Sequence, residues 1–386
     1  MTSLPTRVGA PPDGGPPAHD RPPAGEAARP ARRGRLVAAA LVVVAACLPF
    51  VPLQVPVLFG GPLNSPGVLH LLSLMCVMAA VAVTYDLLFG FTGLLSFGHG
   101  LYVALGMYTT AVVLNTTDLG LPAALGAVLV LGLLAPLLLG AVCLRVSGIA
   151  FAMVTLAFAQ AGAIFVIRDP FEVTGGELGL VLDYRKLPQR LVGVFNAEYR
   201  YWLALALLVA VVVTVRWALA SRPGRVWLAI RDNEQRVAVL GLRPYTFKLL
   251  AFVLSSLLAS LAGAGYALVV GGAHAEITRP TFTLGLLVMV VLGGTGRAHG
   301  ALVGGLVYTY LVHRLGALSS AVQDLPAVVR APLMEPLLLL GTLFVLLVLF
   351  LPGGLVSIAG RGGPDPRWRT ALRRRWRSAL HRRGTS

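Results

Sequence analysis

The chain has 386 residues, of which 56% are hydrophobic and 12% are charged, and its formal net charge at pH 7 is +16. A soluble domain carries about 25% charged residues because its surface must face water. Half that fraction leaves too little polar surface to coat a globule, which excludes a soluble domain and makes lipid the main solvent. The positive charge lies in the two tails and one internal loop, a placement that indicates membrane topology and not nucleic-acid binding.

The N-terminal segment is rich in proline and glycine and contains no apolar stretch. We therefore expect residues 1–35 to be a disordered cytoplasmic tail, not a signal peptide. The three cysteines, Cys47, Cys76 and Cys143, lie in apolar runs without a C-x-x-C pair, so the sequence predicts neither a metal site nor a disulfide framework.

Apolar segments then follow one another from residue 36 to residue 358. A bilayer core of about 30 Å requires roughly 20 apolar residues per helix. The pattern predicts an all-α fold, a polytopic transmembrane helical bundle of about ten spans that includes broken and short helices. The expected spans cover residues 36–53, 68–89, 96–114, 121–144, 149–167, 201–220, 248–271, 282–292, 298–318 and 336–358, of which the eighth is too short to cross unaided.

Arginine-rich segments set the expected orientation, because positive loops stay on the cytoplasmic side. The N-terminal tail, the 221–247 loop and the C-terminal tail all carry such clusters, and an even number of spans puts them on one side. Both termini are therefore expected to be cytoplasmic. The 168–200 segment lies outside, has balanced charge, and is the candidate to meet an extracytoplasmic partner.

The first polar interruption of the apolar pattern runs from Tyr85 to Tyr108 and contains Gly93, Ser96, Gly98 and His99. Non-helical backbone at membrane depth is tolerated where it is buried in protein or lines a wet cavity, and broken helices form binding sites in transporters. Close helix packing through small residues is the competing interpretation. His99 is expected either to bond a neighbouring backbone carbonyl or to contact substrate.

A similar string recurs about two hundred residues later. Gly90-Phe-Thr-Gly93 followed by His99-Gly100 resembles Gly293-Gly-Thr-Gly296 followed by His299-Gly300. Internal repeats are common in transporter folds, although short glycine strings also recur by chance.

The 221–247 loop contains a second informative stretch. From Arg225 to Gly241, the apolar positions 226, 230, 237 and 240 approximate a helical period. This predicts a short amphipathic helix that ends in glycine. Its mixed charges favour docking to another protein over lying flat in the lipid interface.

The C-terminal tail, residues 359–386, has apolar residues every four positions from Trp368 to Leu380, with arginines between them. This pattern is typical of a basic amphipathic helix held by anionic lipid. A specific protein partner is the alternative.

The sequence contains no recognised catalytic or nucleotide-binding motif, such as the phosphate-binding loop, the H-E-x-x-H zinc motif or the G-x-S-x-G nucleophile elbow. Asp86 is the only clear carboxylate inside a span, whereas ion-coupled carriers keep acidic relays within the membrane. We expect a transport protein and not an enzyme, with energy supplied from elsewhere.

These stretches resemble the permease subunits of ABC importers for branched-chain amino acids, in the LivM-like branch. The resemblance covers about Leu69 to Val356 and is most specific in the coupling segment, where the ATPase docks. The matching positions there include Gly224, Arg225, Ala229, Arg231, Asn233, Glu234 and Gly241.

The resemblance implies a permease domain over residues 36–358 in the bacterial plasma membrane, paired with a second permease subunit. It also implies two cytoplasmic ATP-binding subunits and an extracytoplasmic solute-binding protein. No cofactor would be bound by this chain, with ATP and Mg²⁺ on the partner subunits. The translocation pathway is expected at Gly93, Ser96, Gly98, His99, Thr174, Gly293 and Gly294.

Other functions stay open at this point. Sister systems with similar permeases carry urea or short amides. A secondary carrier coupled through Asp86, and a membrane scaffold without transport, are the alternatives from other classes.

Overall fold

The computed structural model describes residues 29–52, 61–193, 196–297, 299–321, 336–350 and 353–359. The chain divides into two units, Met1–Cys47 and Leu48–Ser386. In the first unit, helix α1 covers Arg29–Cys47. It begins seven residues before the expected span start at Leu36, because alanine and arginine favour helix and Pro30 is tolerated in a first turn. The rest of the predicted N-terminal tail, and the C-terminal tail beyond Ala359, lie outside the described residues.

The second unit consists of helices, which confirms the all-α class. The long helices are α2 (Pro66–Asp86), α3 (His99–Thr116), α4 (Leu121–Cys143), α5 (Ile149–Arg168), α6 (Ala197–Ala220), α9 (Pro244–Val270), α10 (Pro280–Gly293), α11 (Gly300–Ala321) and α13 (Pro336–Phe350). Shorter helices are α7 (Arg222–Asp232), α8 (Glu234–Val239) and α14 (Val356–Ala359). Single helical turns lie at Leu48–Phe50, Leu87–Phe91, Gly176–Leu178, Tyr184–Lys186, Gln189–Leu191 and Ala275–Thr278.

Five helices among the described residues are long and apolar enough to cross a membrane. They are Pro66–Phe91, Leu121–Cys143, Ile149–Arg168, Ala197–Ala220 and Pro244–Val270. The apolar helices Ala39–Phe50 and Pro280–Gly293 are shorter, so the predicted short eighth span is observed as a short helix. The protein is therefore a multi-pass membrane protein, and its described residues contain five of the expected full-length spans, judged by length and composition.

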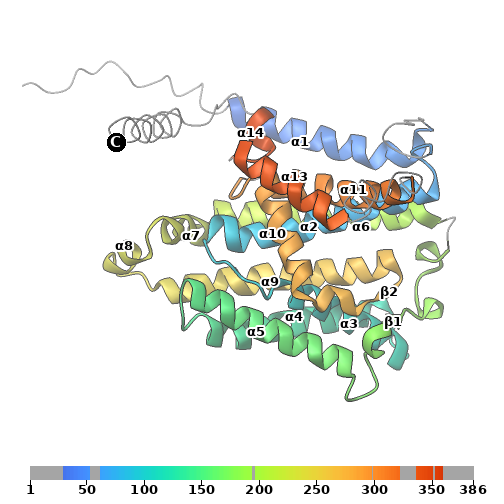
Figure 1. Cartoon of the computed structure of the whole chain (residues 1–386), viewed down its shortest axis with the longest axis horizontal. Coiled ribbons are helices and arrows are strands. Elements are labelled where there is room, and N and C mark those ends of the chain that lie inside the picture. The colour runs from blue at the N-terminus through green and yellow to red at the C-terminus, as the bar shows by residue number, and fades with distance from the viewer. Residues whose placement is uncertain are drawn as a thin grey trace, which may run out of the picture. The chain divides into compact units, whose positions relative to one another are not determined.

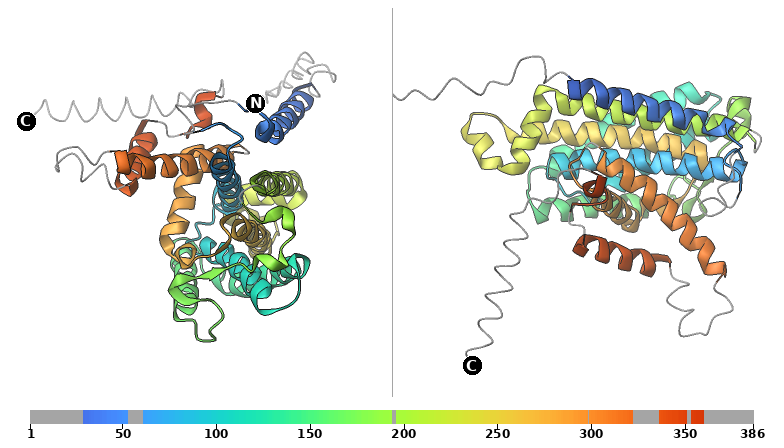
Figure 2. Two further views of the ribbon diagram at one scale, coloured as in Figure 1. Left: turned by 90° about the vertical axis from the view of Figure 1, so that its right-hand side faces the viewer. Right: turned by 90° about the horizontal axis from the view of Figure 1, so that it is seen from above.

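Helix α9 occupies the centre of the second unit and packs against α2, α3, α4 and α6 (Figures 1 and 2). Its most apolar window is 67% buried, as is that of α2, whereas the corresponding window of α4 is only 22% buried. Helices α3 and α9 approach closely at glycines, because a Cβ added to Gly106 would lie 1.8 Å from the carbonyl oxygen of Ser260. Small residues are how membrane helices achieve such contacts. The buried core thus lies along α2, α3 and α9, and α4 leaves an apolar face for lipid or a partner.

The two ends of the helices differ in structure. Helices α7 and α8 lie beyond the C-terminal end of α6 and the N-terminal end of α9, and we call this the α7 end (Figure 1). At the other end, strand β1 (Leu180–Val181) pairs antiparallel with β2 (Gly272–Ala273). We call this the β end. The 168–200 segment therefore folds onto the bundle there, where the Asn115 side chain donates a hydrogen bond to the Val181 carbonyl at 2.8 Å.

Candidate functional site

The first glycine string forms a break between α2 and α3 at the α7 end. Helix α2 runs into a wide helical turn at Leu87–Phe91, and the chain then leaves helical geometry until α3 starts at His99. Gly93 has φ +78°, a conformation that favours glycine. The predicted break in this span is confirmed.

The second glycine string forms the corresponding break between α10 and α11. Gly294 has φ +113° and Gly296 has φ +65°. A Cβ added to Gly293 would lie 1.9 Å from the Gly300 carbonyl oxygen, so the turn closes only with glycine at that position. Residues after α13 also pack here, because the Leu355 amide donates to the Leu292 carbonyl at 2.9 Å.

The two breaks touch each other. The Gly296 amide donates a hydrogen bond of 2.9 Å to Oδ1 of Asp86, which is only 2% exposed. A Cβ added to Gly90 would lie 2.5 Å from the same Gly296 amide nitrogen. The repeated strings thus form a single contact across 210 positions of sequence.

The segment predicted as one amphipathic helix from Arg225 to Gly241 is two helices. Asn233 has φ −164° and separates α7 from α8, and its side-chain oxygen accepts from the Arg236 amide at 2.9 Å. Asparagine is a favoured N-cap residue, which explains why a new helix starts there. Of the expected apolar positions, Ile230 and Val237 are buried whereas Leu240 is exposed.

Arg231, at the end of α7, reaches both breaks. Its Nη1 donates to the Gly90 carbonyl, and its Cγ would lie 3.3 Å from a Cβ added to Gly93. The same guanidinium occupies the space that a Cβ on Gly296 would need. One residue of the predicted coupling segment is therefore in contact with both glycine strings.

Helices α7 and α8 are also bound to the start of α9. Glu234 forms an ion pair with Lys248 at 2.5 Å, and the Lys248 side chain is almost fully buried. Trp227 is buried, and its Nε1 donates to the Phe247 carbonyl at 2.8 Å. Helices α7 and α8 are therefore in contact with α9 as well as with the breaks.

The remaining residues of the predicted coupling segment shape the local backbone or lie on the surface. Gly224 packs against the Ala218 and Leu219 carbonyl oxygens, and Gly241 ends the segment with φ +81°. Arg225 and Ala229 are exposed.

Three predicted pathway residues, Ser96, Gly98 and His99, lie together at the start of α3. Ser96 and His99 are fully buried, and the His99 Nε2 lies 3.0 Å from the Thr84 hydroxyl. The hydrogen bond to a backbone carbonyl expected for His99 is thus replaced by a bond to a side chain of α2. Ser96 and Gly98 line a tightly packed crevice whose other walls include Tyr102, Thr155 and Phe252.

Thr174 does not join the other pathway candidates. It lies at the β end, beyond the C-terminus of α5, a helix of 20 residues and about 30 Å. Its hydroxyl donates to the Val166 carbonyl at 2.8 Å, and its amide donates to Oδ1 of Asp169 at 2.9 Å. Hydrogen bonds from the Thr174, Val173 and Gly175 amides lower the pKa of Asp169.

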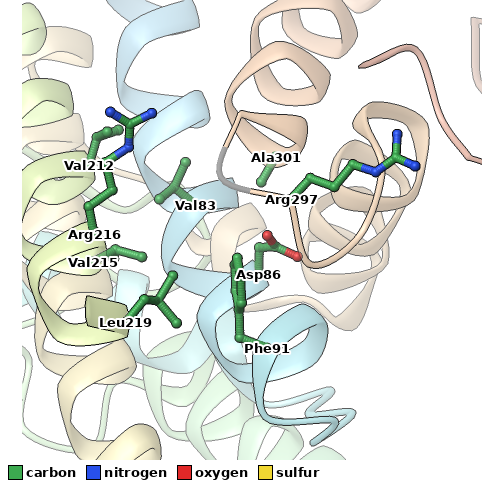
Figure 3. Close-up of a pocket in the computed structure, with 9 residues that line it drawn as sticks. All are labelled: Val83, Asp86, Phe91, Val212, Val215, Arg216, Leu219, Arg297 and Ala301. Atoms are coloured by element: carbon green, nitrogen blue, oxygen red, sulfur yellow. The ribbon is translucent and has the colours of Figure 1, made fainter. Parts of the chain in front are cut away.

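A pocket at the α7 end contains residues that the sequence patterns did not single out. It is a narrow crevice, and Arg216 and Arg297 lie on opposite sides of Asp86 in it (Figure 3). The remaining lining residues are Val83, Phe91, Val212, Val215, Leu219 and Ala301. An arginine inside an apolar span was the available signal for Arg216.

Within the described part of the chain, no group of three or more His, Cys, Asp or Glu side chains is placed to hold a metal ion. Some of the described polar groups join two helices, as at Ser255, whose hydroxyl donates to the Thr84 carbonyl at 2.6 Å.

The described chain is thus a multi-pass helical bundle with paired breaks beside a charged loop. A family described as the permease component of branched-chain amino acid transport systems matches residues 67–351. The chain belongs to this family.

Curated relatives bear the same description. The chain is 26% identical over 351 residues to the high-affinity branched-chain amino acid transport system permease protein LivM of Escherichia coli K12, covering 84% of this chain and 75% of the relative. It is 28% identical over 284 residues to the LivM protein of Salmonella typhimurium LT2, covering 68% and 64%. The probable LivM protein of Methanocaldococcus jannaschii is 26% identical, over 53% of this chain and 59% of its own. No solved structure matches the chain.

Proposed function

We propose that this chain is the permease subunit of an ATP-driven ABC importer that moves branched-chain amino acids across the cytoplasmic membrane. Membership of the permease family over residues 67–351 carries the transport assignment. The contact of Arg231 with both helix breaks carries the coupling assignment. The chain itself binds no cofactor in this proposal, and ATP and Mg²⁺ act on partner subunits.

The α7–α8 pair is the proposed docking surface for a cytoplasmic ATP-binding subunit. Leu228, Val239 and Leu240 are exposed on it although they are large and apolar. Exposed apolar groups rimmed by charges mark interaction sites. A complete importer would contain two such ATP-binding subunits, a second permease subunit and an extracytoplasmic solute-binding protein, which would meet the β end.

This assignment also sets the proposed orientation. The α7 end faces the cytoplasm together with both termini, because the arginine clusters of the tails and of the 221–247 loop then obey the positive-inside rule. The basic tail of residues 359–386 would contact anionic lipid on that side.

In the proposed mechanism, the ATP-binding subunits move α7 between two positions and thereby favour one of two access states. Arg231 transmits the movement to the breaks because it holds the Gly90 carbonyl and packs against Gly93 and Gly296. Lys248 transmits it to α9 through Glu234. The substrate path would run past Ser96 and His99, with Gly293 and Gly294 allowing the second break to change shape.

The test is uptake of radiolabelled leucine into proteoliposomes that contain the assembled importer, with and without internal ATP on the cytoplasmic side. Loss of a charge-assisted hydrogen bond costs about 1.5–3 kcal/mol, so Arg231→Ala is expected to lower ATP-driven uptake about tenfold or more. ATP hydrolysis should persist, because the ATPase site is on another subunit. Arg222→Ala, at an exposed arginine of the same helix, is the matched control.

Two results would redirect the assignment. Uptake that follows an imposed ion gradient without ATP, and that is abolished in Asp86→Asn, would identify a secondary carrier. Competition of leucine uptake by urea or acetamide would identify the urea or short-amide branch.

A further inference from the structure

Helix α5 carries an unpaired polar side chain in the middle of a membrane span. Gln160 is the twelfth of the 20 residues of α5, so it lies roughly 16 Å from the start of the helix and roughly 12 Å from its end. The hydrocarbon core of a bilayer is about 30 Å thick, which places Gln160 near its centre. The side chain is exposed and forms no hydrogen bond with the described part of the chain.

An exposed carboxamide at this depth is poorly suited to lipid. Hydrocarbon offers neither a donor nor an acceptor, so an amide that faces it stays unsatisfied. Helix α4, which lies beside α5 at the periphery of the second unit (Figure 1), shows the contrast. Its exposed side in the middle of the span consists of large aliphatic residues, Val130, Leu134, Leu137 and Leu138. The exposed side of α4 therefore suits lipid, whereas Gln160 indicates that α5 meets water or a polar group.

The residues around Gln160 form one continuous face of α5. Met153, Ala157 and Ile164 are exposed and lie seven and three residues before Gln160 and four residues after it. Residues at these spacings lie on the same side of a helix. We call Met153, Ala157, Gln160 and Ile164 the α5 face. The opposite side of the helix is buried, at Ala152, Thr155, Ala159 and Ala163.

The buried side of α5 is bound to the first helix break. The Phe97 amide donates to the Thr155 hydroxyl at 3.1 Å, and a Cβ added to Gly98 would lie 2.7 Å from the Thr155 carbonyl oxygen. Arg231 contacts the same break through the Gly90 carbonyl. A rearrangement of the break that moves Phe97 or Gly98 would therefore also move α5.

The α5 face has the composition of a site for an aliphatic amino acid. A carboxamide donates hydrogen bonds through its nitrogen and accepts them through its oxygen, so Gln160 can bond both the carboxylate and the ammonium group of a zwitterion. Met153 and Ile164 supply apolar surface on either side of it, as in most small-molecule sites, where a few polar groups lie among apolar walls.

We propose that the α5 face lines the path of the solute and that Gln160 contacts the charged groups of an aliphatic amino acid in the middle of the membrane. This inference rests on the proposed function, because the second permease subunit of that importer would form the opposite wall of the path. Gln160 would contact the solute directly, whereas Ser96 and His99, which are fully buried, would act from the break behind α5.

The experiment uses the assembled importer in proteoliposomes, in a Cys47→Ser background because Cys47 is exposed whereas Cys76 and Cys143 are buried. Gln160→Cys and Leu134→Cys are compared for reaction with a charged methanethiosulfonate, which modifies thiols only where water reaches them. We expect Gln160→Cys to be modified and Leu134→Cys, on the exposed side of α4, to stay unmodified. Leucine at about ten times its KM for the variant should slow the modification about tenfold, because the free fraction of a site falls as 1/(1 + [L]/Kd).

A second measurement uses Gln160→Met, which keeps the length of the side chain and removes the amide. The KM for leucine should rise about tenfold, as expected for the loss of one hydrogen bond to a charged group, while the maximal rate of ATP hydrolysis changes little. Leu134→Met is the matched control and should leave the KM unchanged. Size-exclusion chromatography of each variant checks that the importer is assembled.

Two results would show that Gln160 bonds a helix of the partner subunit, and either would overturn the proposal. One is a Gln160→Cys importer that is assembled but stays unmodified. The other is a Gln160→Met variant that lowers assembly without raising the KM. Modification of Gln160→Cys that leucine does not slow would overturn the contact with solute. Failure of wild type to take up leucine with ATP would instead contradict the proposed function, and modification of Gln160→Cys would still report water at the α5 face.

Discussion

The two glycine strings have similar sequences but lie in different structural environments. In the first break, His99 is fully buried and bonded to Thr84, within the core formed by α2, α3 and α9. In the second break, His299 is exposed and lies against Arg216. The glycines therefore specify the same interruption of a helix twice, whereas the role of each histidine depends on the helix that packs beside it. A repeat in sequence predicts repeated backbone and not repeated chemistry.

The largest loss of stability is expected from a substitution that fills the space between the two breaks. Gly90→Ala would place a methyl group against the Asp86 carboxylate and the Gly296 amide, and overpacking of this kind costs up to about 3 kcal/mol. Thiol labelling of the buried Cys76 and Cys143 during heating in detergent would report the lower unfolding temperature.

Gly126→Ala in α4 is the matched control, because nothing lies within 4 Å of the added Cβ. It should be neutral or stabilising by about 1 kcal/mol. Equal stability of the two variants would show that the breaks are not in contact.

An intermediate effect on stability is expected where α8 meets α9, and it tests whether Arg231 alone holds helices α7 and α8 in place. Glu234→Gln leaves the buried Lys248 without its partner, whereas Lys248→Met removes the charge and fills the space. Lys248 is buried but the Glu234 side chain is 45% exposed, so Glu234→Gln should lose about 1 kcal/mol and Lys248→Met less. The same thiol-labelling assay checks which variant loses more stability. A larger loss in Lys248→Met would mean that water solvates the charge of Lys248 when Glu234 is removed.

A smaller effect separates the two histidines. His99→Leu removes the bond to Thr84 inside the core and should cost about 1 kcal/mol, the usual worth of a neutral hydrogen bond. His299→Leu changes an exposed side chain and should stay within about 0.5 kcal/mol of wild type. The unfolding temperatures of the two variants, measured side by side, check this order. A larger loss of stability in His299→Leu than in His99→Leu would contradict it.

The smallest effect on stability is expected away from both breaks, in the turn at the β end. Hydrogen bonds from the Thr174, Val173 and Gly175 amides lower the pKa of Asp169 from its ordinary value of 3.8. The stabilisation of this turn is therefore present above pH 3.8 and is lost as the pH falls through the lower folded pKa. Hydrogen exchange at residues 173–175, corrected for the intrinsic rate, should show protection disappearing in that acid range. Asp169→Asn should remove the pH dependence, and its persistence there would assign it to another group.

Local signals in the sequence predicted the helix breaks well. Gly93, Gly294 and Gly296 adopt positive φ, which is a property of the residue itself. The short helix Pro280–Gly293 also followed from its apolar length. Asn233 carried a signal for the split between α7 and α8 as a preferred cap, but the apolar period on both sides of it suggested one continuous helix.

Contacts between distant segments could not be predicted in this way. The bond from Arg231 to Gly90 joins residues 141 positions apart, and nothing near either residue encodes the other. Thr174 matched the expected pathway motif, yet it lies at the β end because α5 carries it there. The pairing of β1 with β2 likewise depends on the arrival of the end of α9 beside the 168–200 segment.

The contact among Asp86, Gly90, Arg231 and Gly296 has a consequence for descent. Each of the four positions limits what the others can be, because a Cβ at Gly90 or Gly296 would occupy space already filled by Asp86 or Arg231. Lineages that lose one of these residues should therefore have changed the others as well. These four positions, some of which lie far apart in the chain, are therefore expected to co-vary among homologues.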